Sequence, residues 1–223
     1  MSSDFTPVTV DIETSGLHPV KDFALLSIAM QNYDTGEYIY KELDLRVVGD
    51  EAGHEVFLGE RADGGECLLK IAPKAMELNK LLYDTVSIGG VVQPHKGRVS
   101  RKQADEECAA FLKGIRNPKM MGLNIAGFDI LYIQEYLPLT AALCNFQVID
   151  LNTLFATQAY YKEQGFFDFR MPIQRYCEHW TYDYALQQGL HLFPHHALFD
   201  VFVESTMFAY LGKTPAEWMK RVE

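Results

Sequence analysis

The stretch from Val8 to Pro19, VTVDIETSGLHP, places two acids inside an apolar run. Its first residues alternate and are rich in β-branched side chains, which predicts a buried strand that ends near Thr14. Residues two apart on a strand point to the same face, so Asp11 and Glu13 are expected to be neighbours. Buried carboxylates repel each other unless a cation lies between them, and an oxygen-only ligand set favours Mg²⁺ or Mn²⁺ over zinc. The alternative is a strand end that emerges into water and leaves both acids solvated.

The whole chain, residues 1–223, fits a single domain. Of its residues 48% are hydrophobic and 22% are charged, so a sizeable core is expected. Residues 46–70 are glycine-rich and charged, and they predict an insertion or long loop that contains at most a short hairpin. The formal net charge of -10 argues against a protein that holds duplex DNA by overall positive charge. It does not exclude nucleic acid, because divalent cations invert the field of an acidic site.

Cysteine spacing and hydropathy narrow the class of protein further. The four cysteines form no C-x-x-C pair, so a structural zinc site is not expected. The first residues, MSSDFTPV, have neither the basic nor the apolar region of a signal peptide, and no apolar run reaches transmembrane length. We therefore expect a reduced, cytoplasmic protein without a membrane partner.

The order of the expected elements indicates the fold class. Strands are expected at residues 7–14, 23–33 and 36–45, and their short connections predict an antiparallel meander. Helices and further strands then alternate. The expected strands are 119–125 and 146–151, and the expected helices are 72–84, 100–115, 128–137, 152–161 and 195–213, with helical pieces in 162–194 and a short terminal helix in 214–223. This order predicts an α/β domain with a mixed β-sheet flanked by helices.

Two further acids and a histidine stand out from their surroundings. Asp129 follows a short strand at the expected start of a helix, where a rigid strand end and free N–H groups favour a ligand site. Taken alone, it is an ordinary acid stabilised by the helix dipole. Asp200 lies among apolar residues of a helix and therefore needs a partner. His195 comes five residues earlier, where a surface histidine at a helix start is the commoner situation.

Three segments together resemble a known family. DIETSGL (Asp11–Leu17), GLNIAGFDI (Gly122–Ile130) and HHALFD (His195–Asp200) resemble, in this order, the three exonuclease motifs of the DEDDh group in the ribonuclease H-like superfamily. The group includes the proofreading subunit of bacterial DNA polymerase, ribonuclease T and phage-encoded exonucleases. The resemblance spans most of the chain and implies a ribonuclease H-like fold. The chain departs from the family pattern at Leu123, where relatives often have histidine.

The resemblance implies two-metal hydrolysis of a phosphodiester at a 3′ end. Two Mg²⁺ or Mn²⁺ ions would be held by four acids, Asp11, Glu13, Asp129 and Asp200. These ions would also be the positive partner that the buried acids require. His195 would be the general base, because an imidazole accepts a proton near neutral pH. The adjacent His196 is the rival, and the H-x-A-x-x-D spacing of the family selects His195.

The substrate contacts follow from the same resemblance. Thr14 and Leu17 belong to the turn that cradles the terminal base in relatives and places an apolar wedge there. Phe128 resembles an aromatic residue that stacks on a base, and its alternative is an ordinary core residue. Asn124 matches the asparagine of the second motif, and residues 72–79, APKAMELN, resemble a helix that packs beside the substrate. A single-stranded end fits such a site better than a duplex.

The leading hypothesis is a 3′-to-5′ exonuclease that releases nucleoside 5′-monophosphates from single-stranded nucleic acid, with DNA favoured over RNA. One alternative is a catalytically idle adaptor that binds nucleic acid or a polymerase, and another is a metal-dependent phosphatase of free nucleotides. The presence of all four acids and the histidine argues against the adaptor, and a wedge with a stacking aromatic suits a polymer end. A polymerase and a second copy of the chain stay open as partners, because some relatives are dimers and others are monomers.

Overall fold

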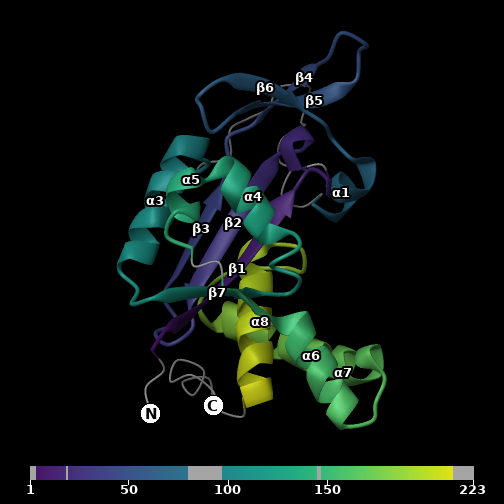
Figure 1. Ribbon diagram of the computed structural model, residues 1–223. Coiled ribbons are helices and arrows are strands. Elements are labelled where there is room, and N and C mark those ends of the chain that lie inside the picture. Colours follow the sequence, from purple (N-terminus) through teal and green to yellow (C-terminus); the bar gives the residue numbers. More distant parts are fainter. Residues whose placement is uncertain (1–3, 19, 80–96, 145–146, 213–223) are drawn as a thin grey trace.

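The computed structural model describes residues 4–18, 20–79, 97–144 and 147–212, and a five-stranded mixed sheet forms its centre (Figure 1). The strands lie in the order β3-β2-β1-β7-β8. Their bounds are β1 Thr6–Thr14, β2 Leu25–Asn32, β3 Tyr38–Glu42, β7 Pro118–Gly122 and β8 Ile149–Asp150. The first three form the expected antiparallel meander, whereas β7 and β8 run parallel to β1. The expected fold class, a mixed sheet flanked by helices, is confirmed.

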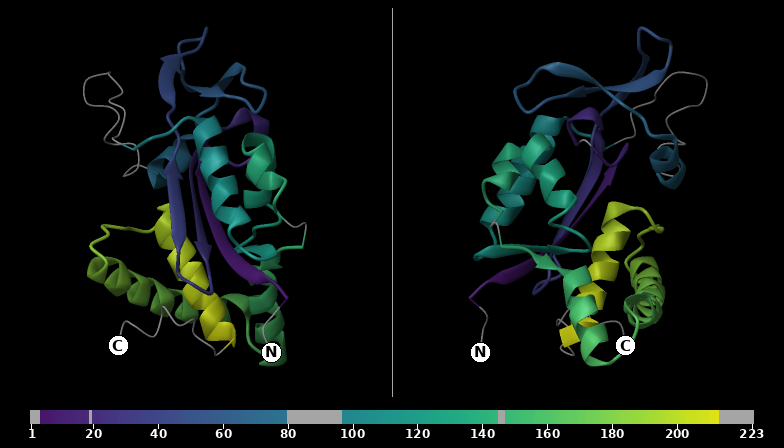
Figure 2. Two further views of the ribbon diagram at one scale, coloured as in Figure 1. Left: turned by 90° about the vertical axis from the view of Figure 1, so that its left-hand side faces the viewer. Right: turned by 45° about the vertical axis from the view of Figure 1, so that its right-hand side comes forward.

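Helices cover both faces of this sheet (Figure 2). Their bounds are α1 Pro73–Leu78, α3 Arg101–Lys113, α4 Asp129–Tyr136, α5 Pro138–Ala141, α6 Leu151–Tyr161, α7 Phe166–Gln187 and α8 Ala197–Gly212. The helices α3, α4 and α5 pack together over one face, and α8 packs on β1 and β2 from the other. The helices α6 and α7 pack against each other and against α8, and Leu151 and Phe155 of α6 share a core cluster with Met121 of β7.

The central strand β1 is buried on both faces, and its alternation directs successive side chains to different helix layers. Its even-numbered residues belong to a core cluster with side chains of α3 and α4, and these residues are Val8, Val10 and Ile12. Thr9 points to the other face, where its hydroxyl oxygen lies 2.6 Å from the hydroxyl oxygen of Ser205 on α8. Asp11 and Glu13 are two and four residues beyond Thr9, so both face α8.

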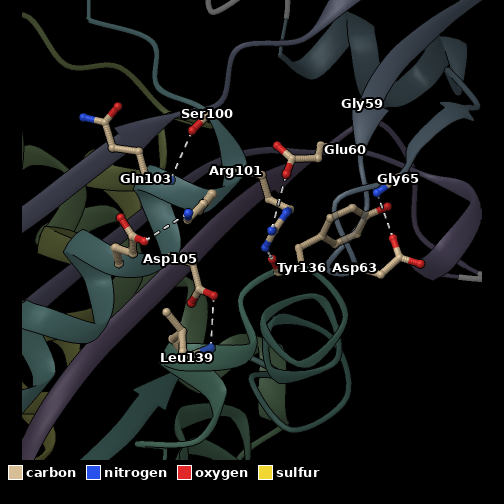
Figure 3. A network of polar contacts seen from close by, with 12 residues as sticks. Gly59, Glu60, Asp63, Gly65, Ser100, Arg101, Gln103, Asp105, Tyr136 and Leu139 are labelled. Atoms are coloured by element: carbon tan, nitrogen blue, oxygen red, sulfur yellow. Dashed lines mark hydrogen bonds and ion pairs between the residues drawn. The ribbon is translucent and has the colours of Figure 1, made fainter.

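The expected insertion is more regular than a loop with a short hairpin. It forms a second, three-stranded antiparallel sheet above one end of the central sheet (Figure 1). Its strands are β4 Arg46–Gly49, β5 Glu55–Glu60 and β6 Glu66–Leu69. Phe57 and Leu69 join the main core. Arg101 of α3 donates to the carbonyl oxygen of Tyr136 at 2.8 Å and pairs with Glu60 of β5 at 3.6 Å (Figure 3), which ties the second sheet to the helices.

The aromatic-rich span 162–194 contains one long helix instead of several pieces. Helix α7 runs for 22 residues and includes Pro172 in its second turn. Its buried residues recur every four positions, at Ile173, Cys177, Thr181 and Ala185. Side-chain hydrogen bonds of 2.9 Å join Arg170 to Gln174 and Gln174 to Glu178, and each spans one helical turn. A continuous buried stripe and these bonds hold the helix together across the proline.

Several element boundaries differ from expectation. Helix α1 ends at Leu78, and residues 80–84 of the expected helix lie outside the described residues, as does the expected terminal helix 214–223. The strand expected at 146–151 is reduced to the two residues of β8. Helix α8 begins at Ala197 and not at residue 195, because His195 has a left-handed backbone that a helix cannot contain. Among the described residues, no helix is long and apolar enough to cross a membrane.

Candidate active site

The site begins where β7 separates from β1. Their parallel pairing ends at Thr9 of β1. Gly122, at the end of β7, passes so close to β1 that a Cβ there would lie 2.8 Å from the carbonyl oxygen of Val10. Glycine is therefore required for the two strands to approach this closely. Ile12 lies beyond the residues of β1 that pair with β7, and its N–H bonds to the carboxylate of Asp129. This bond fixes the first residue of α4 beside β1.

Helix α8 brings further acidic groups to the same end of β1. Asp200 lies in its first turn, and Glu204 follows one turn later. One ligand atom from each of Glu13, His195 and Asp200 lies within 4.8 Å of the others. The charges of Asp200, Glu204, Asp129 and Glu13 all act on Asp11. Three segments that are far apart in the sequence, namely β1, the start of α4, and the segment from His195 into α8, therefore place the five predicted catalytic residues around one centre.

The two adjacent histidines lie in different environments. His195 is exposed, has a φ of 62°, and directs a ring nitrogen to Glu13 and Asp200. His196 is only 8% exposed and packs on the Tyr40 ring, with ring centroids 4.5 Å apart. Burial lowers the pKa of His196, so its neutral form is favoured. Only His195 has access to both the carboxylates and a ligand.

Burial gives the acids unusual proton affinities. It raises the pKa of Glu13 to about 9, that of Asp129 to about 8 and that of Asp200 to about 7. The pKa values of Asp11 and Glu204 are also raised well above the ordinary range, first by burial and next by the charge of a neighbouring acid. In the absence of a cation, the protein therefore holds part of this cluster in the protonated form at neutral pH.

The donor set suits a hard divalent cation. The cluster consists of carboxylate oxygens with one imidazole nearby, and Mg²⁺ and Mn²⁺ prefer such oxygen ligands. The charges that act on Asp11 all come from other acids. The Arg170 guanidinium lowers the pKa of Glu204, but this is the smallest of the effects on that group. The acids are a buried group of like charges, and too little positive charge from the protein lies beside them. A bound cation would neutralise this group.

The four expected substrate contacts surround this end of β1, but they differ in availability. Leu17 is 67% exposed in the turn after β1. Phe128 precedes Asp129 and is half-buried, because part of its ring packs against the core. Asn124 is exposed with a φ of 58° in the turn between β7 and α4. Thr14 is buried, and its hydroxyl donates to a backbone carbonyl of its own turn at 2.7 Å. Leu17, Phe128 and Asn124 keep accessible surface for a ligand, whereas the Thr14 hydroxyl is used inside the protein.

Two residues of the site were not predicted. Glu204 is 4% exposed, and one of its oxygens accepts from the Leu123 N–H at 3.0 Å. Its other oxygen is buried with no hydrogen-bond partner in the described part of the chain. Asn79, the residue after α1, hydrogen-bonds to Glu13 and is 3% exposed. The signal for Glu204 was available, because it is a charge in the same apolar helical run as Asp200 and lies one turn away.

The raised pKa values predict that the metal-free protein loses stability as the pH rises. These acids titrate near pH 4 in an unfolded chain but near pH 7 to 9 in the fold, so the folded state binds more protons between about pH 4 and 9. We expect the Tm in EDTA to fall by about 5–10 °C between pH 5 and pH 9, since 1 kcal/mol corresponds to about 2–4 °C at this chain length. Added Mg²⁺ should raise the Tm, and by more at the higher pH, because the ligands must be deprotonated. Thermal unfolding followed by circular dichroism checks both trends. A Tm that depends on neither pH nor Mg²⁺ would contradict the prediction.

Comparison with known proteins agrees with this geometry at the level of the fold. No protein-family model and no curated protein matches the sequence. The chain is similar to the structure of the metal-free form of the E. coli ExoI–ssDNA complex, with 15% identity, a TM-score of 0.51, and coverage of 96% of this chain and 41% of the other. The zinc-bound form of that complex gives 16% identity, a TM-score of 0.50, and coverage of 95% and 41%. A further structure of exonuclease I gives 16% identity, a TM-score of 0.50, and coverage of 96% and 42%.

The likeness establishes the fold. The mixed sheet with flanking helices is that of the ribonuclease H-like α/β class, to which the sequence motifs pointed. The chain spans about two fifths of the length of the structures that it matches.

Proposed function

We propose that the chain is a metal-dependent 3′-to-5′ exonuclease that acts on single-stranded nucleic acid, DNA in preference to RNA, and releases nucleoside 5′-monophosphates. The observation that carries this proposal is the convergence of Glu13, His195 and Asp200 within 4.8 Å, with Asp11 and Asp129 acting electrostatically on the same group. The likeness to structures of the E. coli ExoI–ssDNA complex supports it at the level of the fold.

The acids would bind Mg²⁺ or Mn²⁺ ions, two of them by resemblance to the family. The proposed ligands are Asp11, Glu13, Asp129 and Asp200. When bound, such ions lower the pKa of a coordinated water and stabilise the charge that develops on the phosphate oxygens. The protein orients these ligands through its backbone, as the bond from the Ile12 N–H to Asp129 illustrates. Asn79 does the same for Glu13.

His195 is proposed to accept the proton of the attacking water. Its imidazole is exposed, lies beside Glu13 and Asp200, and is held by a left-handed backbone outside α8. A general base has to lie within hydrogen-bond reach of the proton that it takes from the attacking water. The buried His196, whose neighbours are aromatic rings, does not meet this requirement.

The surface around the carboxylates suits the end of a single strand. Leu17 projects from the turn after β1 and can wedge against the terminal base, while the exposed part of Phe128 offers a ring for stacking. Stacking on an aromatic ring is tolerant of sequence, which fits a nuclease that removes any nucleotide in turn. A free nucleotide would not need a wedge.

A gel assay tests the proposal directly. Single-stranded DNA and RNA of one sequence, labelled at the 5′ end, are incubated with Mg²⁺, Mn²⁺ or EDTA, beside an Asp11→Ala control. We expect a ladder that shortens from the 3′ end, requires the metal and is absent in the variant, with nucleoside 5′-monophosphates as products and DNA as the faster substrate. Inorganic phosphate released from nucleotides would indicate the phosphatase instead. Binding without cleavage would overturn the proposal in favour of an adaptor.

A further inference from the structure

A pocket of about 650 Å³ lies beside the candidate active site, between α7 and the segment that leads into α8. One wall is a single face of α7, because its side chains are three, four, seven and eight residues apart. These side chains are Arg175, Glu178, His179, Tyr182 and Asp183. Pro194 and Phe199 complete the lining, and they directly precede His195 and Asp200 in the sequence. The pocket is therefore continuous with the segment that carries the proposed base.

The polar groups of this pocket are available for a ligand. Arg175, His179 and Tyr182 are exposed, and within the described ranges their side chains have no hydrogen bond or ion pair. The Tyr182 ring is 50% exposed. Glu178 is bonded to the preceding turn of α7, and its charge acts on Asp200, so the pocket is within electrostatic reach of the carboxylates. The pocket is open to solvent, and its volume falls in the usual range for ligand sites.

The pocket and the expected wedge lie on different sides of the carboxylates. Leu17 and Phe128 belong to the turn after β1 and to the start of α4, whose helix layer covers one face of the sheet. The pocket belongs to α7, which packs on α8 over the other face (Figure 2). A scissile phosphodiester at the carboxylates has a nucleotide on each side, and each needs a surface to lie on.

We propose that this pocket binds the nucleotide on the 5′ side of the scissile bond, with its base against Tyr182 and Arg175 directed to the strand's backbone phosphate. This inference rests on the proposed exonuclease function. Tyr182 supplies a stacking surface that accepts any base. Glu178 and Asp183 can accept hydrogen bonds from base amino groups. Because the lining holds two acids and one arginine, a base and not a phosphate occupies its centre.

A thermodynamic cycle tests this assignment. It combines a protein variant with a DNA strand that lacks one base. The Kd of a 5′-fluorescent single-stranded DNA is measured by anisotropy, with Ca²⁺ in place of Mg²⁺ to limit turnover. The strand is intact, abasic at the penultimate nucleotide, or abasic at the terminal nucleotide. The variant is Tyr182→Ala, and the matched control is Tyr160→Ala, which changes a tyrosine that is 80% exposed on α6.

We expect Tyr182→Ala and loss of the penultimate base each to weaken binding about tenfold, and the two together to weaken it little more, because both remove the same stacking contact. Loss of the terminal base should add independently to Tyr182→Ala. Arg175→Gln should reduce the slope of log Kd against log salt by about 0.7, the value for one phosphate contact on a single strand. Arg61→Gln, on the β5–β6 connection, should leave that slope unchanged.

The outcomes separate this inference from the function on which it rests. If the wild type degrades and binds the strand but Tyr182→Ala behaves like Tyr160→Ala, the pocket assignment is overturned and the exonuclease stands. The assignment is also overturned if the effect of Tyr182→Ala on Kd adds to the loss of the penultimate base but not to the loss of the terminal base. If the wild type neither binds nor cleaves any strand, both fail.

Discussion

Asp200→Asn should reduce the rate of hydrolysis about a thousandfold or more and should raise the thermal stability of the metal-free protein. The amide has the shape of the acid but not its charge, so it removes a proposed ligand that lies within 4.8 Å of Glu13 and His195. The expected loss corresponds to the several kcal/mol of charge stabilisation that a metal ion contributes. The same change relieves repulsion, because the charge of Asp200 raises the pKa values of Asp11, Glu13 and Glu204. Nuclease rates and the Tm in EDTA at pH 8 measure the two effects.

Glu204→Gln is the matched comparison for this prediction. It removes another buried charge of the cluster, and the glutamine oxygen can still accept the hydrogen bond from the Leu123 N–H. We expect a similar gain in metal-free stability with activity retained to within about tenfold, the lower end of the effects of residues that support metal ligands. Equal inactivation of both variants would mean that Glu204 is itself a ligand. Full activity of Asp200→Asn would refute the proposed site.

The sequence predicted the parts of the fold in which one local pattern decides the outcome. The pattern in Val8–Thr14 indicated a buried strand and placed Asp11 and Glu13 on the same side, and the structure shows that both faces of this strand are buried. The apolar run around Asp200 indicated a buried helix, and this helix is the one that covers the acidic side of β1. The meander was predictable for the same reason, since short connections between alternating segments leave few other arrangements.

Features that depend on distant contacts were missed. The second sheet contains turns at Gly53 and Gly64, both with positive φ, and charged residues obscured the strand pattern between them. Its stability depends on Phe57 reaching the main core, which no local pattern reveals. The continuity of α7 across Pro172 likewise depends on a stripe packed against α8. Glu204 differs from these, because its place in an apolar helix was visible, but it matched no family motif.

The second prediction concerns the two histidines. His195→Asn should lower the rate about a hundredfold to ten-thousandfold, the usual contribution of a general base, and should leave the Tm within about 1 °C of the wild type. Asparagine tolerates the left-handed backbone at this position, with its φ of 62°, so the fold is not strained by the change. The amide cannot take the proton of the attacking water near neutral pH. Single-turnover rates on a labelled strand, measured beside the Tm, separate lost chemistry from lost structure.

His196→Ala should give the reverse result. This side chain is 8% exposed and packs on Tyr40 and Phe193, so its removal leaves a cavity that costs about 2–3 kcal/mol, or about 4–12 °C in Tm. The rate per folded molecule, measured well below the Tm, should stay within about threefold of the wild type, because His196 is buried away from the carboxylates that His195 reaches. If His196→Ala loses more activity than His195→Asn at a temperature where both are folded, the proposed base is wrong. Equal losses would point to a shared structural role of the segment before α8, and they too would exclude His195 as the base.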